Sequence, residues 1–208
     1  MPRSARLVIP GMPHLIRQMA SREAKLFISD LDRSRYLYLV RNHASQSDTT
    51  ILAYALLDTE VLFVVVPNRP DSLARFMRSL SMRHAQEMNR RHQAIGHLWR
   101  SRYYSTIVEQ DSPQAAIAYV ETAAVRAGAT ERADEFHWSS AAYHALRRAD
   151  STISSNLVMQ GMPPAEWQIV LQQFPQSECR RFESNLTRGL PSGSIDFISK
   201  LEEQTGLA

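Results

Sequence analysis

The chain has 208 residues, 44% of them hydrophobic, and a formal net charge of +3. This apolar content suffices for the core of one domain plus an appendage, and no apolar run approaches the roughly 20 residues that cross a membrane. The single cysteine, Cys179, excludes an internal disulfide and a cysteine-based zinc site. Together with the lack of a long apolar stretch near the start, it favours a reducing cytoplasm and no signal peptide.

The first part of the chain alternates between strand-like and helix-like patterns. Residues 13–19 predict a short first strand. Side-chain oxygens at 29–32 can cap a helix that continues to about residue 43, where apolar residues recur at helical spacing as Leu31, Tyr36, Leu39 and Val40. Two apolar runs, 50–57 and 61–66, then predict a β-hairpin. The second run is nearly continuous, as in a strand that is buried on both faces.

A second helix, a last strand and a third helix are expected next. Asp71 and Ser72 can cap a helix to about residue 91, with an apolar side formed by Leu73, Phe76, Met77, Leu80 and Met88. Residues 105–109 predict a strand. Ser112 and Pro113 open a helix that is expected to run to about Ala127 and to stop at Gly128. The order β-α-β-β-α-β-α matches the ferredoxin-like arrangement, an α+β fold in which helices back an antiparallel sheet.

Positive charge gathers between residues 69 and 102. This window holds eight arginines, with only Asp71 and Glu87 to oppose them. Such a one-sided run predicts a surface for a polyanion, and we expect nucleic acid to bind there. The residues that we expect to contact it are Arg75, Arg78, Arg83, Arg90, Arg91, His97, Trp99, Arg100, Arg102 and, from the third helix, Arg126.

The stretch from Gly96 to Glu109 mixes cations, aromatic rings and small hydroxyls. Arg100 and Arg102 can grip phosphates, and Trp99 and the two following tyrosines offer flat faces to bases. The alternative is a loop that enters a strand, with Trp99 as a core anchor. His97 could hold a phosphate or cap this loop, and Arg126 could pair with the end of its helix.

Residues 129–208 predict a helical appendage, so we divide the sequence into a domain at 1–128 and an extension at 129–208. Trp138 to Ser140 indicate a helix start, and Trp138 could anchor the extension to the sheet. Short amphipathic helices are expected at 164–174, 177–187 and 195–204, with a turn at 189–193. Both a helix-turn-helix unit and a bundle that only stabilises the domain or a dimer fit this pattern.

Short motifs spread along nearly the whole chain resemble those of the REP-associated tyrosine transposases, relatives of the single-tyrosine transposases of the HUH nuclease superfamily. They are Gly11–His14, Ala53–Leu57, Ser72–Met77, Gly96–Trp99 with Arg102, Tyr119–Glu121, Val125–Gly128, Trp138–Ser140 and Gly189–Ser194. The resemblance implies a protein of DNA transposition that binds single-stranded or hairpin DNA such as a REP element. It also implies nicking through a tyrosine and a divalent metal, a homodimer, and a place in the cytoplasm near a bacterial nucleoid.

The chain departs from that family at the metal site. The family's His-hydrophobic-His motif reads Glu60-Val61-Leu62, and the polar residue one helical turn after the tyrosine is Ala123. Glu60 could still bind a hard cation or be an ordinary turn carboxylate, whereas Leu62 cannot coordinate a metal. We therefore expect a vestigial metal position at Glu60 and no cofactor, with Mg²⁺ or Mn²⁺ only if the site is active.

Tyr119 stands at the nucleophile's place, and the small residues around it on the helix predict an accessible ring. The alternative is a tyrosine packed on an amphipathic helix. Three functions follow, and they leave open whether the chain is an enzyme. The first is a DNA-binding protein of transposase descent with a decayed nuclease site. The second is an active metal-dependent transposase that uses Tyr119 with Glu60 and either His14 or His97. The third is a module that binds RNA or a protein without strand chemistry.

Overall fold

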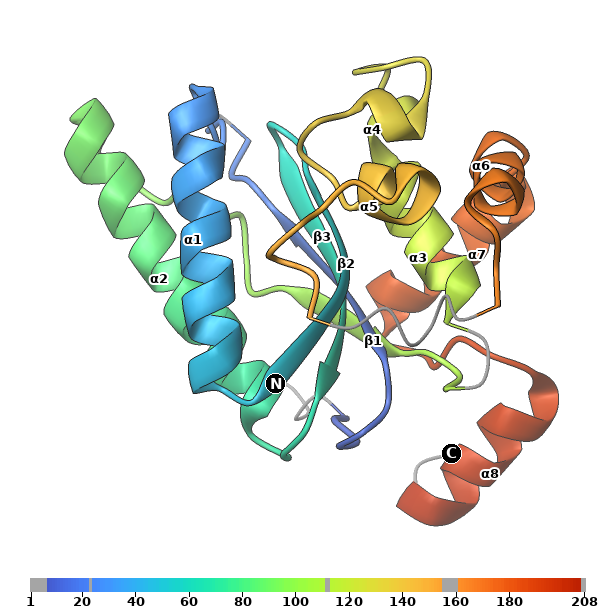
Figure 1. The fold of residues 1–208 in the computed structure, drawn as a ribbon. Coiled ribbons are helices and arrows are strands. Elements are labelled where there is room, and N and C mark those ends of the chain that lie inside the picture. The colour runs from blue at the N-terminus through green and yellow to red at the C-terminus, as the bar shows by residue number, and fades with distance from the viewer. Residues whose placement is uncertain (1–6, 23, 111–112, 155–160, 207–208) are drawn as a thin grey trace.

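The computed structural model describes residues 7–22, 24–110, 113–154 and 161–206. A four-stranded antiparallel sheet, in the order β2-β3-β1-β4, lies between two layers of helices (Figure 1). Its strands are β1 (His14–Met19), β2 (Thr49–Leu56), β3 (Glu60–Pro67) and β4 (Tyr104–Ile107). The predicted ferredoxin-like α+β fold is confirmed, although Ser112, the expected start of the third helix, lies outside the described residues.

The helices α1 (Asp30–Gln46) and α2 (Ser72–His92) cover one face of the sheet. The predicted cap of α1 is confirmed, because Ser29 and Asp32 form a capping box. The apolar side predicted for α2 is buried throughout. The prediction for Leu31 is wrong: its side chain is 52% exposed, because a residue five positions before Tyr36 points about 140° away from it on a helix.

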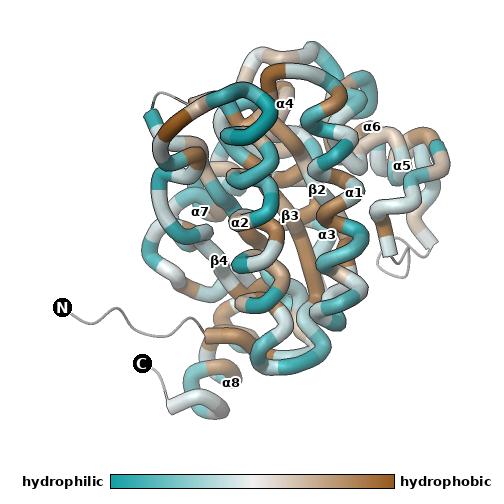
Figure 2. The backbone as a smooth tube through the Cα atoms, turned by 90° about the vertical axis from the view of Figure 1, so that its left-hand side faces the viewer, coloured by the Kyte–Doolittle hydropathy of each residue, from teal (hydrophilic) through white to brown (hydrophobic). Residues whose placement is uncertain are grey.

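Strand β3 is buried on both faces, as its continuous apolar run predicts. Val61, Phe63 and Val65 pack into the core beneath α1 and α2. Leu62 and Val64 point the other way, into a second core on the opposite side of the sheet. In Figure 2 the hydrophobic strands β2 and β3 lie inside the molecule, behind the more hydrophilic helices.

The second core is covered by α3 (Gln114–Glu121), α4 (Ala123–Arg126), α5 (Ala141–Leu146), α6 (Pro164–Gln172) and α7 (Gln176–Arg188). A short 3₁₀ turn at Ala133–Glu135 joins α4 to the segment before α5. The expected single helix to Ala127 is instead interrupted at Thr122. The Thr122 hydroxyl donates to the Ala118 carbonyl oxygen at 2.6 Å, and such a bond from a side chain back to the preceding turn bends helices.

The extension belongs to the same core as the sheet. Trp167 of α6 and Phe182 of α7 pack in one cluster with Leu62. The predicted attachment at Trp138 is confirmed through its backbone, because its carbonyl oxygen accepts from the Leu56 amide at 2.9 Å. The last helix, α8 (Ile195–Thr205), projects from the body of the molecule (Figure 1). No helix within the described residues is long and apolar enough to span a bilayer.

Candidate functional site

The residues predicted to bind nucleic acid fall into two groups on opposite sides of the sheet. One group lies on α2 and in the segment before β4. The other consists of Arg126, which lies beside Tyr119 at the end of the α3–α4 helix pair. We call the exposed arginines on this side of the sheet, Arg78, Arg83, Arg90, Arg100 and Arg102, the basic face. On α2, Arg83 and Arg90 lie on the same side of the helix, and Arg78 points about 140° away from Arg83.

The basic face carries arginines that are free to meet a ligand. None of its five side chains forms a hydrogen bond or ion pair with any residue of the described ranges, and all five are exposed. Figure 2 views this side, where α2 runs in front of the sheet. Two other predicted contacts are engaged within the protein: Arg75 donates to the Gln46 carbonyl oxygen, and Arg91 pairs with Asp32.

Trp99 fixes the segment that carries Arg100 and Arg102. Its indole N–H donates to the Ser81 carbonyl oxygen of α2 at 2.9 Å, and its ring lies 5.8 Å from that of His84. The Arg100 amide continues the edge of β1 by donating to the Met19 carbonyl oxygen at 3.0 Å. Of the two roles considered for Trp99, these contacts favour the anchor.

Tyr119 is buried, so the prediction of an accessible ring is wrong. Only 1% of the residue is exposed, and its ring centre lies 5.2 Å from that of Phe182 on α7. The small side chains around it on α3 let a covering helix pack closely instead of leaving the ring open. Burial raises the pKa of Tyr119 to about 12, although the positive charges of Arg126 and Arg17 act to lower it.

Arg126 is held against Tyr119. Its guanidinium lies 4.3 Å from the centre of the tyrosine ring and donates to the Tyr119 carbonyl oxygen at 2.8 Å. A further bond joins it to the Thr122 hydroxyl at 2.6 Å. These contacts support the predicted pairing with the helix end, and they also place a permanent positive charge beside the tyrosine.

Glu60 and Leu62 lie on the side of β3 that faces Tyr119. Leu62, Ala123 and Tyr119 belong to one buried cluster, in which Leu62 is fully buried and Ala123 is 2% exposed. Glu60 is engaged by Arg17 of the neighbouring strand, with 2.5 Å between the arginine Nε and the Glu60 carboxylate. Arg17 is a residue that sequence reasoning missed, because only the pairing register of β1 and β3 brings it to Glu60.

The residues at this position do not fit a divalent metal. Leu62 and Ala123 have no donor atoms, and the carboxylate of Glu60 already faces the guanidinium of Arg17. The alternative ligands are elsewhere: His14 lies at the far end of β1, where it pairs with Val65, and His97 lies on the α2 side of the sheet. Within the described ranges no group of three or more His, Cys, Asp or Glu side chains could hold a metal ion.

His14 is also unsuited to bind a metal because both of its ring nitrogens are hydrogen-bonded to the backbone. Its Nδ1 donates to the Met12 carbonyl oxygen at 2.8 Å, and its Nε2 accepts from the Ile9 amide at 3.4 Å. Burial lowers the pKa of the imidazole to about 4, although the bond to Met12 acts to raise it. His14 is therefore a neutral, structural histidine.

Glu121 is a second residue that sequence reasoning missed. Its carboxylate is fully buried and accepts from Ser140 at 2.5 Å, from His144 at 2.5 Å and from the indole N–H of Trp167 at 2.8 Å. These bonds tie α3 to α5 and α6 directly behind Tyr119. A single carboxylate in the apolar run from Ala115 to Ala124 was the available signal, because a buried charge requires several partners.

The comparisons with known proteins agree with this architecture. The family described as "Transposase IS200 like" matches residues 11–123, more than half of the chain, and the protein belongs to that family. No curated protein matches the chain.

The solved structures that are similar to this chain include two transposases. One is described as a REP-associated tyrosine transposase bound to a REP hairpin. It is 13% identical with a TM-score of 0.59, over 76% of this chain and 93% of its own, and so shares the fold. The other is a putative transposase from Deinococcus radiodurans R1, 18% identical over 63% of this chain and 94% of its own. Its TM-score of 0.38 is too low to show a shared fold.

Proposed function

We propose that this protein binds single-stranded or hairpin DNA of the REP type through its basic face, and that its tyrosine-nuclease site has decayed. The observation that carries the second part is the pairing of Glu60 with Arg17 next to the aliphatic Leu62. In an active site of this family a metal would polarise the scissile phosphate at that position. Here the position holds an internal ion pair and an apolar side chain.

Three features support DNA as the partner. The exposed arginines of the basic face have no internal partners within the described ranges, so they are available to displace counterions from phosphates. The family is one of transposases, and the solved relative that shares the fold is described as bound to a hairpin. From the family alone we also propose a homodimer in the cytoplasm, near the nucleoid.

Fluorescence anisotropy with one labelled sequence in three forms tests the proposal: hairpin DNA, fully duplex DNA and hairpin RNA. We expect hairpin DNA to bind most tightly, with an affinity that falls steeply as salt rises. A Tyr119→Phe variant is expected to bind equally well, because the hydroxyl is not part of the basic face. RNA binding as tight as or tighter than DNA binding would instead assign the protein to RNA.

A further inference from the structure

A pocket of about 390 Å³ opens at the end of α2, on the same side of the sheet as the basic face. We call it the loop pocket. It lies between the last turns of α2, four residues that precede α1 and the segment from Ala94 to Leu98; the four residues are Ser21, Ala24, Lys25 and Ile28. Its size falls within the range of about 300–1,000 Å³ that is usual for sites that hold small organic groups.

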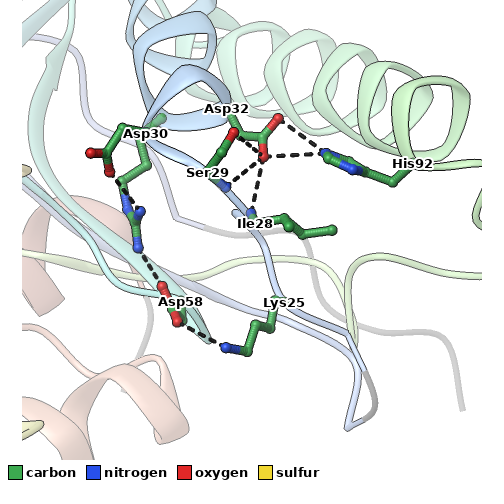
Figure 3. Close-up of polar contacts among 8 residues, drawn as sticks. Lys25, Ile28, Ser29, Asp30, Asp32, Asp58 and His92 are labelled. Carbon is green, nitrogen blue, oxygen red and sulfur yellow. Dashed lines mark hydrogen bonds and ion pairs between the residues drawn. The ribbon is translucent and has the colours of Figure 1, made fainter.

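The walls of the loop pocket are fixed by a buried carboxylate. Asp32 accepts from the backbone amides of Ile28 and Ser29 at 3.0 and 2.9 Å, and from His92 of α2 at 3.2 Å (Figure 3). Arg91 pairs with the same carboxylate. The side chain of Asp32 is fully buried, so the start of α1, the segment before it and the end of α2 are held as one unit.

The third wall is a loop of defined shape. The Asn89 side chain donates to the Gly96 carbonyl oxygen at 3.2 Å, and the Ser21 amide donates to the Leu98 carbonyl oxygen at 2.9 Å. Gly96 has a φ of 117°, a conformation that side chains rarely adopt. The pocket is therefore formed before any ligand arrives, which lowers the entropic cost of binding.

The lining combines an apolar surface with positive charge. Met88 and Leu98 form buried parts of it, while Ile28 and Ile95 stand on the rim at 60% and 103% exposure. Two isoleucines this exposed at one pocket form an apolar contact surface rather than scattered surface residues. Such a surface suits the flat face of an aromatic ring.

One polar side chain at the pocket is free to bind a phosphate. Lys25 and His92 line the pocket together with His97. Within the described residues, Asp32 is paired with Arg91 and His92, and Asp58 is paired with Arg33 and Lys25; Figure 3 shows the pairs of His92 and Lys25. His97 is exposed and has no side-chain partner within the described residues.

We propose that the loop pocket holds one unpaired nucleobase of a bound DNA strand, packed against Ile95, with its phosphate accepting a hydrogen bond from His97. A base supplies the flat apolar face, and its phosphate supplies the negative charge. The position at the end of α2 joins the pocket to the basic face, so one strand can occupy both. This inference rests on the proposed function and adds to it a specific contact that is not electrostatic.

Abasic substitution tests the pocket directly. A hairpin DNA with single-stranded flanks is compared with a series in which each flanking nucleotide in turn lacks its base. We expect one position at which loss of the base weakens binding about 10-fold, since stacking of a base on a protein is a strong and local contribution. In the Ile95→Ser variant the intact strand should bind about 10-fold more weakly, and the same abasic site should then have no further effect.

The matched control is Ile195→Ser, which makes the same substitution at another exposed isoleucine. Ile195 lies on α8 and is 83% exposed. It should bind every strand of the series as the parent does. If the parent binds the hairpin but the abasic and Ile95→Ser losses are additive, or neither occurs, the pocket holds no base and the inference is overturned while the proposed function stands. Binding of free mononucleotides without any abasic effect would also overturn it. Failure of the parent to bind any DNA would refute the proposed function itself.

Discussion

The ring of Tyr119 lies 5.2 Å from the ring of Phe182, and through this contact α7 covers the tyrosine that we propose was the nucleophile. The contact joins the transposase-like part of the chain to its extension. It also explains why a tyrosine that is retained in the sequence is 1% exposed in the fold.

Phe182→Ala should uncover Tyr119. The pKa of the tyrosine should fall from about 12 toward its ordinary value of 10, because burial is the main cause of the increase. The loss of a buried phenyl ring should lower the free energy of unfolding by about 3–5 kcal/mol. Ultraviolet titration of tyrosinate measures the first effect, and urea unfolding measures the second.

The control for this experiment is Phe174→Ala, which trims a partly buried ring of the same core cluster. It should leave the pKa of Tyr119 near 12. Adding Tyr119→Phe to Phe182→Ala should remove the titration that had moved to lower pH. This loss would assign that titration to Tyr119. A titration curve that Phe182→Ala does not change would show that α7 does not control this hydroxyl.

Acid should destabilise the fold in two steps. Burial lowers the pKa of His14 and His84 from 6.5 to about 4, although bonds to backbone carbonyl oxygens act to raise both. Between pH 6.5 and 4 the unfolded chain therefore binds protons that the folded chain does not, and stability falls as the pH falls. Each histidine should contribute a loss of about 2 kcal/mol between pH 7 and pH 5.

The second step belongs to Asp32. Burial alone raises the pKa of this carboxyl, but the hydrogen bonds from His92, Ile28 and Ser29 lower it to about 2. The stabilisation by this group is present above pH 3.8 and is lost as the pH falls toward 2. Urea unfolding at a series of pH values should show both windows. His84→Gln should remove about half of the pH dependence in the first window, because His14 still contributes, whereas the same change at the exposed His137 should leave it unchanged.

The basic face can be tested by charge reversal. Arg100→Glu with Arg102→Glu should remove most of the affinity for hairpin DNA and should make the remaining binding less dependent on salt. Both side chains are exposed, so the thermal midpoint should stay within a few degrees of the parent's. Arg148→Glu with Arg188→Glu, two exposed arginines of the extension, forms the control. Equal affinity of the parent and the Arg100/Arg102 variant would exclude this segment from the interface.

Glu121 should be among the most sensitive positions of the core. Glu121→Leu leaves the donors of Ser140, His144 and Trp167 without their acceptor, and we expect a loss of about 3–5 kcal/mol in urea unfolding. Adding Trp167→Phe should lower the free energy of unfolding by less in this variant than in the parent, because the indole N–H has already lost its partner. Glu131→Gln, on the surface, is the control. A loss under about 0.5 kcal/mol would mean that the buried network contributes nothing to stability.

The fold could be predicted because its signals are local. The cap at Ser29 and Asp32, the hairpin around Asp58 and the continuous apolar run of β3 each lie within a few neighbouring residues. The break at Thr122 was missed, because a single threonine is only a weak signal for the end of a helix. The structure shows its hydroxyl donating to the Ala118 carbonyl oxygen.

The candidate site depended on contacts between residues far apart in the chain. The lack of donor atoms in the side chains of Leu62 and Ala123 was visible directly in the sequence. The cover over Tyr119 was not, because it comes from Phe182 on a helix of the extension. The partner of Glu60 likewise depends on strand register, which places Arg17 next to it.

The most direct test of the central claim is a search for a covalent protein–DNA adduct. The parent is mixed with labelled hairpin DNA and Mn²⁺ or Mg²⁺, denatured, and separated by electrophoresis. A variant with Glu60→His, Leu62→His and Ala123→Asn serves as the comparison. It places metal-ligand side chains on the face that looks toward Tyr119, at a cost of about 1–3 kcal/mol for the buried imidazole at position 62. We expect the parent to bind the hairpin without forming an adduct and the triple variant to gain metal binding. An adduct through Tyr119 should appear when Phe182→Ala is added to the triple variant, because that change uncovers the hydroxyl. An adduct of the parent that Tyr119→Phe abolishes would contradict a decayed nuclease site.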